Sequence, residues 1–152
     1  AVLVLVVALL GLPAQLEIRA SDGHGYATRD AVAAIAEQRQ PGDVIVYALW
    51  ESTGSWTARD AMARYVPPDR RPRDIFAVRP QRTDGQRSAR ECADLEACFD
   101  DPPRVWVLRH GSFGDPLLGL GEAKERLLRE RYTMAFVHQY RGMTVALLVP
   151  PG

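Results

Sequence analysis

The chain has 152 residues, the length of one domain by the usual size of about 100 to 200 residues. Its 47% hydrophobic and 25% charged residues are typical of a globular protein and exclude a disordered tail, a collagen-like fibre and a complete polytopic membrane protein. Nineteen Lys and Arg balance nineteen Asp and Glu, so the chain lacks the excess of basic charge that general binding to nucleic acid requires.

The first twelve residues, Ala1 to Leu12, carry no polar side chain. As a helix they would extend about 18 Å, less than the roughly 30 Å of a bilayer core. Three interpretations fit: the outer end of a transmembrane helix, the apolar centre of a signal peptide, or a buried strand. The following residues are not enriched in Lys or Arg, as cytoplasmic flanks usually are. We therefore expect a fragment of a longer protein in which residues 1–12 end a truncated transmembrane helix, 13–27 are a linker and 28–152 form an extracytoplasmic domain.

Helical and strand-like patterns then alternate along the chain. A helix is predicted from Thr28, as N-cap, to the stop at Pro41. Thr57 and Asp60 have the spacing of a capping box and predict the start of a second helix. The remaining predicted elements are strands at 43–49, 74–78 and 104–109, a helix with its apolar stripe between Leu120 and Leu128, and a hairpin of strands 133–139 and 143–149 joined at 140–142.

This order predicts an α/β fold: a three-layer, Rossmann-like domain with a mainly parallel sheet, closed by a C-terminal antiparallel hairpin and preceded by the end of the transmembrane helix. Ligands of such sheets bind beyond the carboxyl ends of the strands. We therefore expect a site, if the domain has one, at residues 50–56 and 110–115.

The remaining motifs give no specific chemistry. The glycines at 111–114 and 119–121 match neither the dinucleotide fingerprint nor a P-loop, and His110 with Ser112 lacks the nucleophile elbow of a hydrolase. Three isolated histidines do not have metal-ligand spacing. The sequence therefore predicts no cofactor, no metal site and no catalytic residue within this chain.

Seven arginines lie between Arg70 and Arg90, and five acidic residues follow between Glu91 and Asp101. We expect an exposed loop whose arginines pair with the adjoining acids, and the alternative is a patch that binds an anionic ligand.

Cys92 and Cys98 are separated by five residues, which fits neither a redox motif nor a zinc knuckle. Outside the cytoplasm a disulfide is favoured. A continuous helix would hold the two Cα atoms about 9 Å apart, beyond the limit of about 7 Å for a bridge. A disulfide therefore requires a bend between them, such as a helical turn that ends there, and the alternative is two reduced, half-buried cysteines.

Several segments occur in a characteristic order: 39–47 (RQPGDVIVY), 54–61 (GSWTARDA), 71–74 (RPRD), 104–107 (RVWV) and 131–133 (RYT). In their order and spacing they resemble the C-terminal extracytoplasmic region of bacterial multi-span membrane glycosyltransferases of the protein-mannosyltransferase and aminoarabinose-transferase type, glycosyltransferase family 39. The resemblance covers nearly the whole chain, with residues 1–12 as the end of the last membrane helix.

The resemblance implies a cell-membrane enzyme that transfers a sugar, with inversion, from a polyprenyl-phosphate carrier to a glycan or protein acceptor in the cell envelope. The catalytic acids of that family lie in its first external loop, so this chain alone is not expected to be catalytic. We expect it to act as a lid or acceptor-recognition module in which Trp56 stacks on sugar and Arg59 contacts phosphate or carboxylate. The alternative for these residues is that Trp56 packs in the core and Arg59 pairs with a nearby acid.

Two other functions remain open from the sequence. One is a secreted or membrane-tethered α/β binding domain without catalytic activity. The other is a small cytosolic nucleotide-binding protein.

Overall fold

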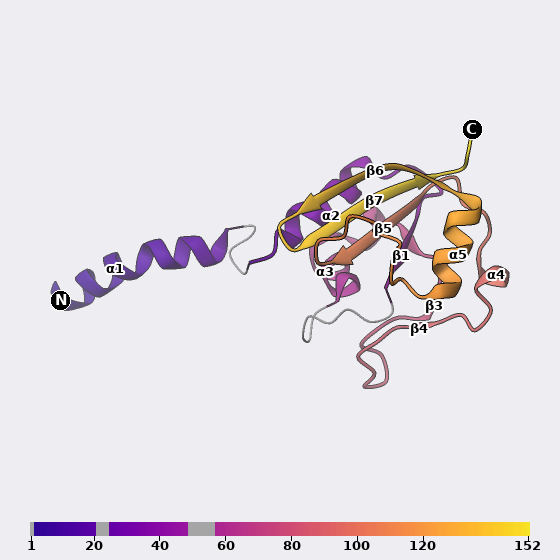
Figure 1. The fold of residues 1–152 in the computed structure, drawn as a ribbon. Helices are drawn as coiled ribbons and strands as arrows, with labels where there is room; N and C mark the ends of the chain where they lie inside the picture. Colours follow the sequence, from indigo (N-terminus) through magenta and orange to yellow (C-terminus); the bar gives the residue numbers. More distant parts are fainter. Residues whose placement is uncertain (1, 21–24, 49–56) are drawn as a thin grey trace.

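The computed structural model describes residues 2–20, 25–48 and 57–152. A five-stranded sheet with the order β2-β1-β5-β7-β6 forms its centre (Figure 1). Its strands are β1 (Val44–Tyr47), β2 (Arg73–Asp74), β5 (Val105–His110), β6 (Thr133–Tyr140) and β7 (Met143–Val149). β2, β1 and β5 are parallel, whereas β7 is antiparallel to both β5 and β6. The predicted α/β class is confirmed, as is the order of parallel strands followed by a closing antiparallel hairpin.

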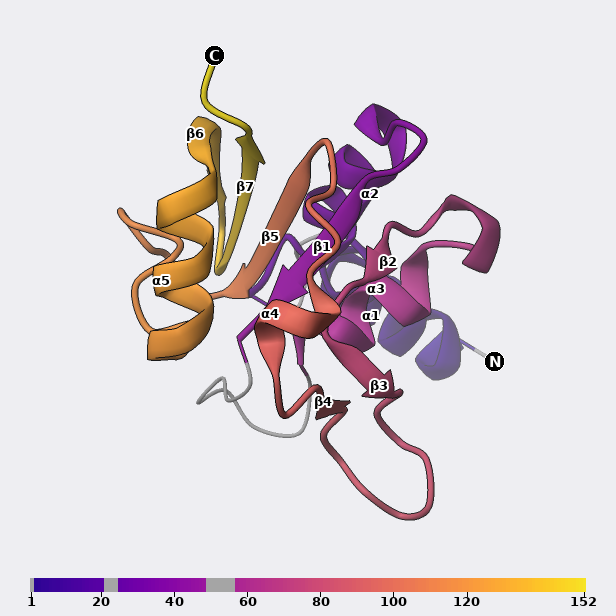
Figure 2. The same ribbon diagram turned by 90° about the vertical axis from the view of Figure 1, so that its right-hand side faces the viewer.

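Helices cover both faces of the sheet (Figure 2). Side chains of β1 alternate: Val44 and Val46 pack on one face, and Ile45 and Tyr47 on the other. Because both sets are buried, the sequence of this strand is a continuous apolar run. One face packs against α2 (Thr28–Gln38) and α3 (Ala58–Tyr65), and the other against α5 (Glu122–Arg131) and the single turn α4 (Leu95–Cys98).

The strand predicted at 74–78 is broken in the structure. Only Arg73–Asp74 pairs with β1, after which Ile75 and Phe76 turn into the core. Ala77–Arg79 (β3) then pairs with Arg90–Glu91 (β4) in a separate two-stranded sheet. The burial of these two large apolar side chains therefore ends the strand that the sequence pattern predicts to continue to residue 78. A short 3-10 helix, η1 (Pro68–Arg70), precedes β2.

The prediction that Thr28 caps its helix is wrong by one residue. Thr28 is the first helical residue, and the cap position is Ala27, whose side chain makes no capping hydrogen bond. The Ala27 amide instead donates to the carbonyl of Arg141 at 2.8 Å. A tertiary contact with the β6–β7 turn therefore fixes the start of this helix.

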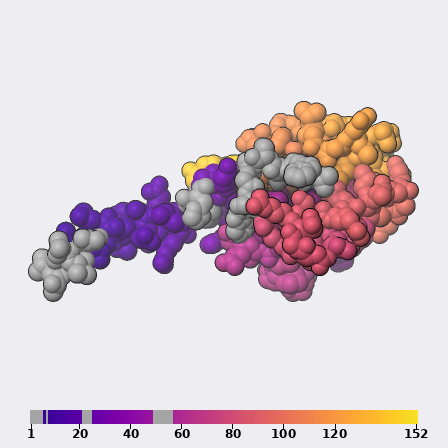
Figure 3. Space-filling model, turned by 90° about the horizontal axis from the view of Figure 1, so that it is seen from below, coloured from indigo at the N-terminus to yellow at the C-terminus, as the bar shows by residue number. Residues whose placement is uncertain are grey.

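The first helix, α1 (Val2–Arg19), continues through Pro13 beyond the predicted boundary at residue 12. The first part of the expected linker, up to Arg19, is thus helical. α1 extends away from the sheet (Figures 1 and 3). Among the described residues, no helix combines the length and the apolar character needed to cross a membrane.

Candidate functional site

The carboxyl ends of the parallel strands β1 and β5 lie at the same edge of the sheet, which we call the carboxyl edge. Ligands of open α/β sheets bind outside this edge, where the connections from neighbouring strands leave in different directions. Here α3 lies on one face of the sheet and α5 on the other. Of the two loops predicted to carry a site, residues 110–115 are described, whereas residues 50–56, including Trp56, lie outside the described residues.

A capping box fixes the first turn of α3 at this edge, as the sequence predicts. The Thr57 side chain accepts a hydrogen bond from the Asp60 amide at 3.2 Å, and the Asp60 carboxylate accepts one from the Thr57 amide at 3.0 Å. Arg82 and Gln81 also donate to Asp60. Burial opposes ionisation of Asp60, but the hydrogen bonds from Arg82 and Thr57 lower its pKa. The start of α3 is therefore held rigidly.

Arg59 points inward from this first turn and is buried. Its Nε donates to Asp74 at 2.6 Å, and its Nη2 forms an ion pair with Glu91. The guanidinium also lies 4.8 Å from the centre of the Tyr47 ring. Burial works against the charge, yet the hydrogen bonds with Asp74 and Glu91 raise the pKa of Arg59. Arg59 thus pairs with nearby acids, as the alternative interpretation of its role expected. A contact between Arg59 and a ligand phosphate stays a prediction.

Lys124 of α5 completes the cluster from the other side. Its Nζ donates to the Tyr47 carbonyl at 2.9 Å and pairs with Glu91 Oε2 at 2.5 Å. Glu91 thus receives one cation on each carboxylate oxygen. Burial lowers the pKa of Lys124, and the ion pair with Glu91 offsets part of this effect. We call Arg59, Asp74, Glu91 and Lys124 the charge cluster; its two cations balance its two carboxylates.

Asp74, Glu91 and Lys124 are not among the site residues predicted from the sequence. Lys124, the only lysine of the chain, lies on the buried face of α5 together with Leu127 and Leu128. A charged residue on an apolar stripe is the signal that identifies it, because a buried charge needs a partner. Asp74 and Glu91 carry no such signal, since both lie in short strands whose pairing only the fold determines.

A groove of about 810 Å³ lies against the cluster, between residues 88–96 and 120–127. Leu95, Leu120 and Leu127 contribute apolar walls, and Glu91 and Lys124 contribute to the lining from the buried side. The segment that includes β4 and α4 and the helix α5 lie on the same face in Figure 3, in salmon and orange. Five exposed charged residues also line the groove: Arg90, Asp94, Glu96, Glu122 and Arg126.

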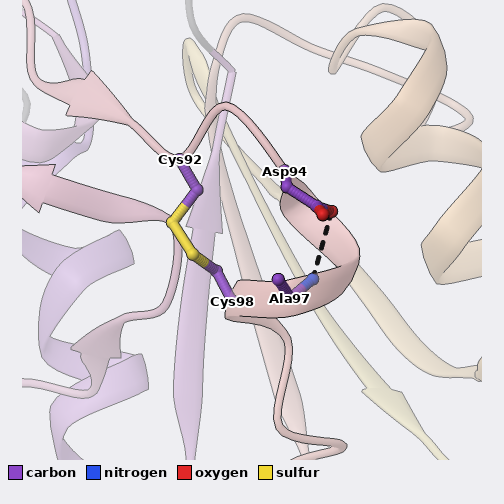
Figure 4. Close-up of a disulfide and its surroundings, with 4 residues drawn as sticks. All are labelled: Cys92, Asp94, Ala97 and Cys98. Carbon is purple, nitrogen blue, oxygen red and sulfur yellow. Dashed lines mark hydrogen bonds between the residues drawn. A yellow bond between two sulfur atoms is a disulfide. The ribbon is translucent and has the colours of Figure 1, made fainter.

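Cys92, which lines this groove, forms a disulfide with Cys98 (Figure 4). Asp94 caps the single turn α4 by accepting a hydrogen bond from the Ala97 amide at 3.2 Å. This turn brings the two Cα atoms to 6.5 Å, within the range of a bridge. The disulfide also restrains Glu91, the residue next to Cys92.

Residues 25–27 pack on the carboxyl edge. The Tyr26 ring lies edge-on to His110 at the end of β5, with 5.1 Å between the ring centres. Tyr26 also packs on Gly142, which has a φ of +71°, and a Cβ at this position would overlap the Tyr26 ring. Burial lowers the pKa of His110. The chain therefore leaves the domain toward α1 on the side of the carboxyl edge.

The arginine-rich stretch is partly paired as expected. Arg73 pairs with Asp100 of the adjoining acidic segment at 2.7 Å, whereas Arg79 pairs with Asp84 inside the arginine-rich stretch at 2.9 Å. Arg71 instead donates to the carbonyls of Ala63 and Val66 at the end of α3, a structural role that the sequence did not indicate. Among residues 2–20, 25–48 and 57–152, no three His, Cys, Asp or Glu residues are arranged to hold a metal ion.

In comparisons with known proteins, the chain matches no family model, no curated protein and no solved structure.

Proposed function

We propose that this chain is the extracytoplasmic C-terminal domain of an integral-membrane glycosyltransferase that transfers a sugar from a polyprenyl-phosphate donor to an acceptor. In this proposal α1 is the end of the last membrane helix. The α/β domain lies in the cell envelope and serves as a lid or acceptor-recognition module. The membrane part of the enzyme carries the catalytic acids.

The observation that carries this proposal is the packing of residues 25–27 on the carboxyl edge. The chain leaves toward α1 from the same edge at which ligands of α/β sheets bind. With α1 in the membrane, this edge faces the membrane surface. A lipid-linked phosphate is held at that surface, so a domain with this orientation is able to cover the reaction site.

The exposed side chains of α1 also support the proposal. Leu9, Leu10 and Leu16 are 60%, 75% and 62% exposed, and they belong to a mostly apolar helix. Burying apolar surface stabilises a protein by about 25 cal/mol per Å², so an exposed surface of this kind favours contact with lipid or with other membrane helices.

The parallel strand order β2-β1-β5, with helices on both faces, supports a Rossmann-like classification as part of the same proposal. Trp56 offers an aromatic face to a sugar ring. Arg59 is buried and paired with Asp74 and Glu91, so a ligand phosphate would compete with these two carboxylates for its guanidinium. The two residues therefore need separate tests.

The test is sugar transfer by the full-length membrane enzyme carrying Trp56→Ala or Arg59→Lys. Tyr65→Ala is the matched control, because Tyr65 is an exposed aromatic residue at the far end of α3. We expect transfer to fall about tenfold for Trp56→Ala, the effect of losing roughly 1.4 kcal/mol of binding, and to be unchanged for the control. Unchanged transfer by Trp56→Ala and Arg59→Lys, with the fold intact, would overturn the recognition role.

Removal of residues 25–152 tests the domain as a whole. Full transfer by the truncated enzyme contradicts a lid or recognition function. The alternative, a membrane-tethered binding domain without an enzyme, predicts that the full-length protein transfers no sugar.

A further inference from the structure

We propose that the groove between residues 88–96 and 120–127 binds a neutral saccharide, the glycan part of the acceptor. This inference rests on the proposed function and names the ligand class of the carboxyl edge.

Charge balance at the buried side of the groove selects against ions. Glu91 and Lys124, which line the groove, belong to a cluster in which two cations neutralise two carboxylates. An ionic ligand would gain no net attraction from this set and would lose its hydration on entering. A neutral polar ligand pays a smaller desolvation cost.

The exposed lining carries charges of both signs. Arg90 and Arg126 supply donors, whereas Asp94 and Glu122 supply acceptors. Glu96, the third exposed acid of the lining, forms an ion pair with Arg131 of α5. Ser88 adds a hydroxyl that both donates and accepts. Such a mixture suits a ligand whose groups act as donors and acceptors at the same time, as saccharide hydroxyls do.

The walls complete the match to a saccharide. The half-buried Leu95 and the exposed Ala93 and Ala123 provide apolar surface for the C–H faces of sugar rings. The groove volume of about 810 Å³ lies within the usual range of about 300 to 1,000 Å³ for ligand sites. One wall is braced by the Cys92–Cys98 disulfide and the other is a helix, so little ordering is required on binding.

The experiment is NMR of the complete 152-residue chain in detergent micelles. It is titrated with the neutral trisaccharides maltotriose and mannotriose and, separately, with inorganic phosphate. Ala123→Trp fills the groove from an exposed position on α5. Ala63→Trp places the same side chain at an exposed position on α3, on the opposite face of the sheet, and is the matched control.

We expect at least one trisaccharide to shift the amide signals of 88–96 and 120–127, with affinity reduced at least tenfold by Ala123→Trp and unchanged by Ala63→Trp. Phosphate is expected to leave these signals in place. Absence of groove shifts with both trisaccharides overturns the inference, as does binding of phosphate alone.

A transfer assay separates this inference from the proposed function. If the saccharide binds but Ala123→Trp leaves transfer by the full-length enzyme unchanged, the groove is a saccharide site without a role as acceptor site, and the inference fails on that point. If Ala123→Trp and removal of residues 25–152 both abolish transfer while neither trisaccharide binds, the proposed function stands and the saccharide site does not.

Discussion

The two ends of the parallel strands are held by buried charges in different ways. At the amino end, the buried carboxylate of Asp43 accepts hydrogen bonds from Arg104 at 2.8 Å and from the Trp106 indole at 2.8 Å. These partners lie at and just before the start of β5, which is paired with β1. At the carboxyl end, the charge cluster joins α3, β2, β4 and α5 to the end of β1.

This difference separates a clamp at one end of two neighbouring strands from a cluster that joins elements on both faces of the sheet. The Asp43 clamp joins the starts of β1 and β5 and the end of α2, so its loss disturbs mainly this end of the sheet. The charge cluster unites elements on both faces of the sheet and lies against the groove, so its loss disturbs the candidate site as well. Four predictions test this distinction, beginning with the largest expected effect.

Glu91→Ala is expected to lower the free energy of unfolding by about 3 to 5 kcal/mol, because Arg59 and Lys124 would then lose a shared buried partner. Urea unfolding monitored by circular dichroism measures this change. Glu130→Ala, at an exposed position of α5, is the control and should change stability by less than about 0.5 kcal/mol. A loss below 1 kcal/mol for Glu91→Ala would show that the cluster does not hold these elements together.

Asp43→Asn is expected to cost about 1 to 3 kcal/mol at neutral pH, since the charged acceptor of Arg104 and Trp106 is lost. Burial opposes ionisation of Asp43, but hydrogen bonds from Arg104, Gln40 and Trp106 lower its pKa below the ordinary value of 3.8. The stabilisation is therefore complete above pH 3.8 and is lost as the pH falls through the pKa of the folded state.

The difference in stability between wild type and Asp43→Asn should accordingly shrink as the pH is lowered below 3.8. Urea unfolding across the acid range measures it. A difference that stays constant with pH contradicts the assignment of Asp43 as a charged clamp.

Replacing both cysteines by alanine is expected to cost about 2 kcal/mol, from the chain entropy of a loop with a sequence separation of 6. The NMR signals of Glu91 and Lys124 should shift, whereas the Trp106 indole signal at the other end of β5 should not. Equal shifts at both ends would contradict the separation of the two clamps. Chemical reduction of the wild type provides an independent comparison.

Thr57→Ala has the smallest expected effect, about 1 kcal/mol, because it removes one side of the capping box at the start of α3. Thr57→Ser retains the hydroxyl and is the control. Thermal unfolding measures both variants. Equal destabilisation by Ala and Ser would show that the methyl group of Thr57, and not its hydrogen bond, is responsible.

Much of the fold was predictable because it depends on residues close in sequence. The capping box links Thr57 to Asp60 within one turn, and the β6–β7 hairpin closes over Arg141 and Gly142. The apolar run of β1 predicted a strand with both faces buried. The break after Asp74 was not predictable in the same way, because a single sequence pattern does not report that Ile75 and Phe76 turn into the core.

The sequence by itself thus determined the α/β class, the order of most elements and the location of the edge at which to look for a site. Only the tertiary structure decided the chemistry of that edge. Arg59 meets Asp74 and Glu91 across separations of 15 and 32 residues. Such pairs form only when particular strand ends become neighbours. The packing of the whole sheet determines which strand ends do so, whereas periodicity along the chain reports only local structure.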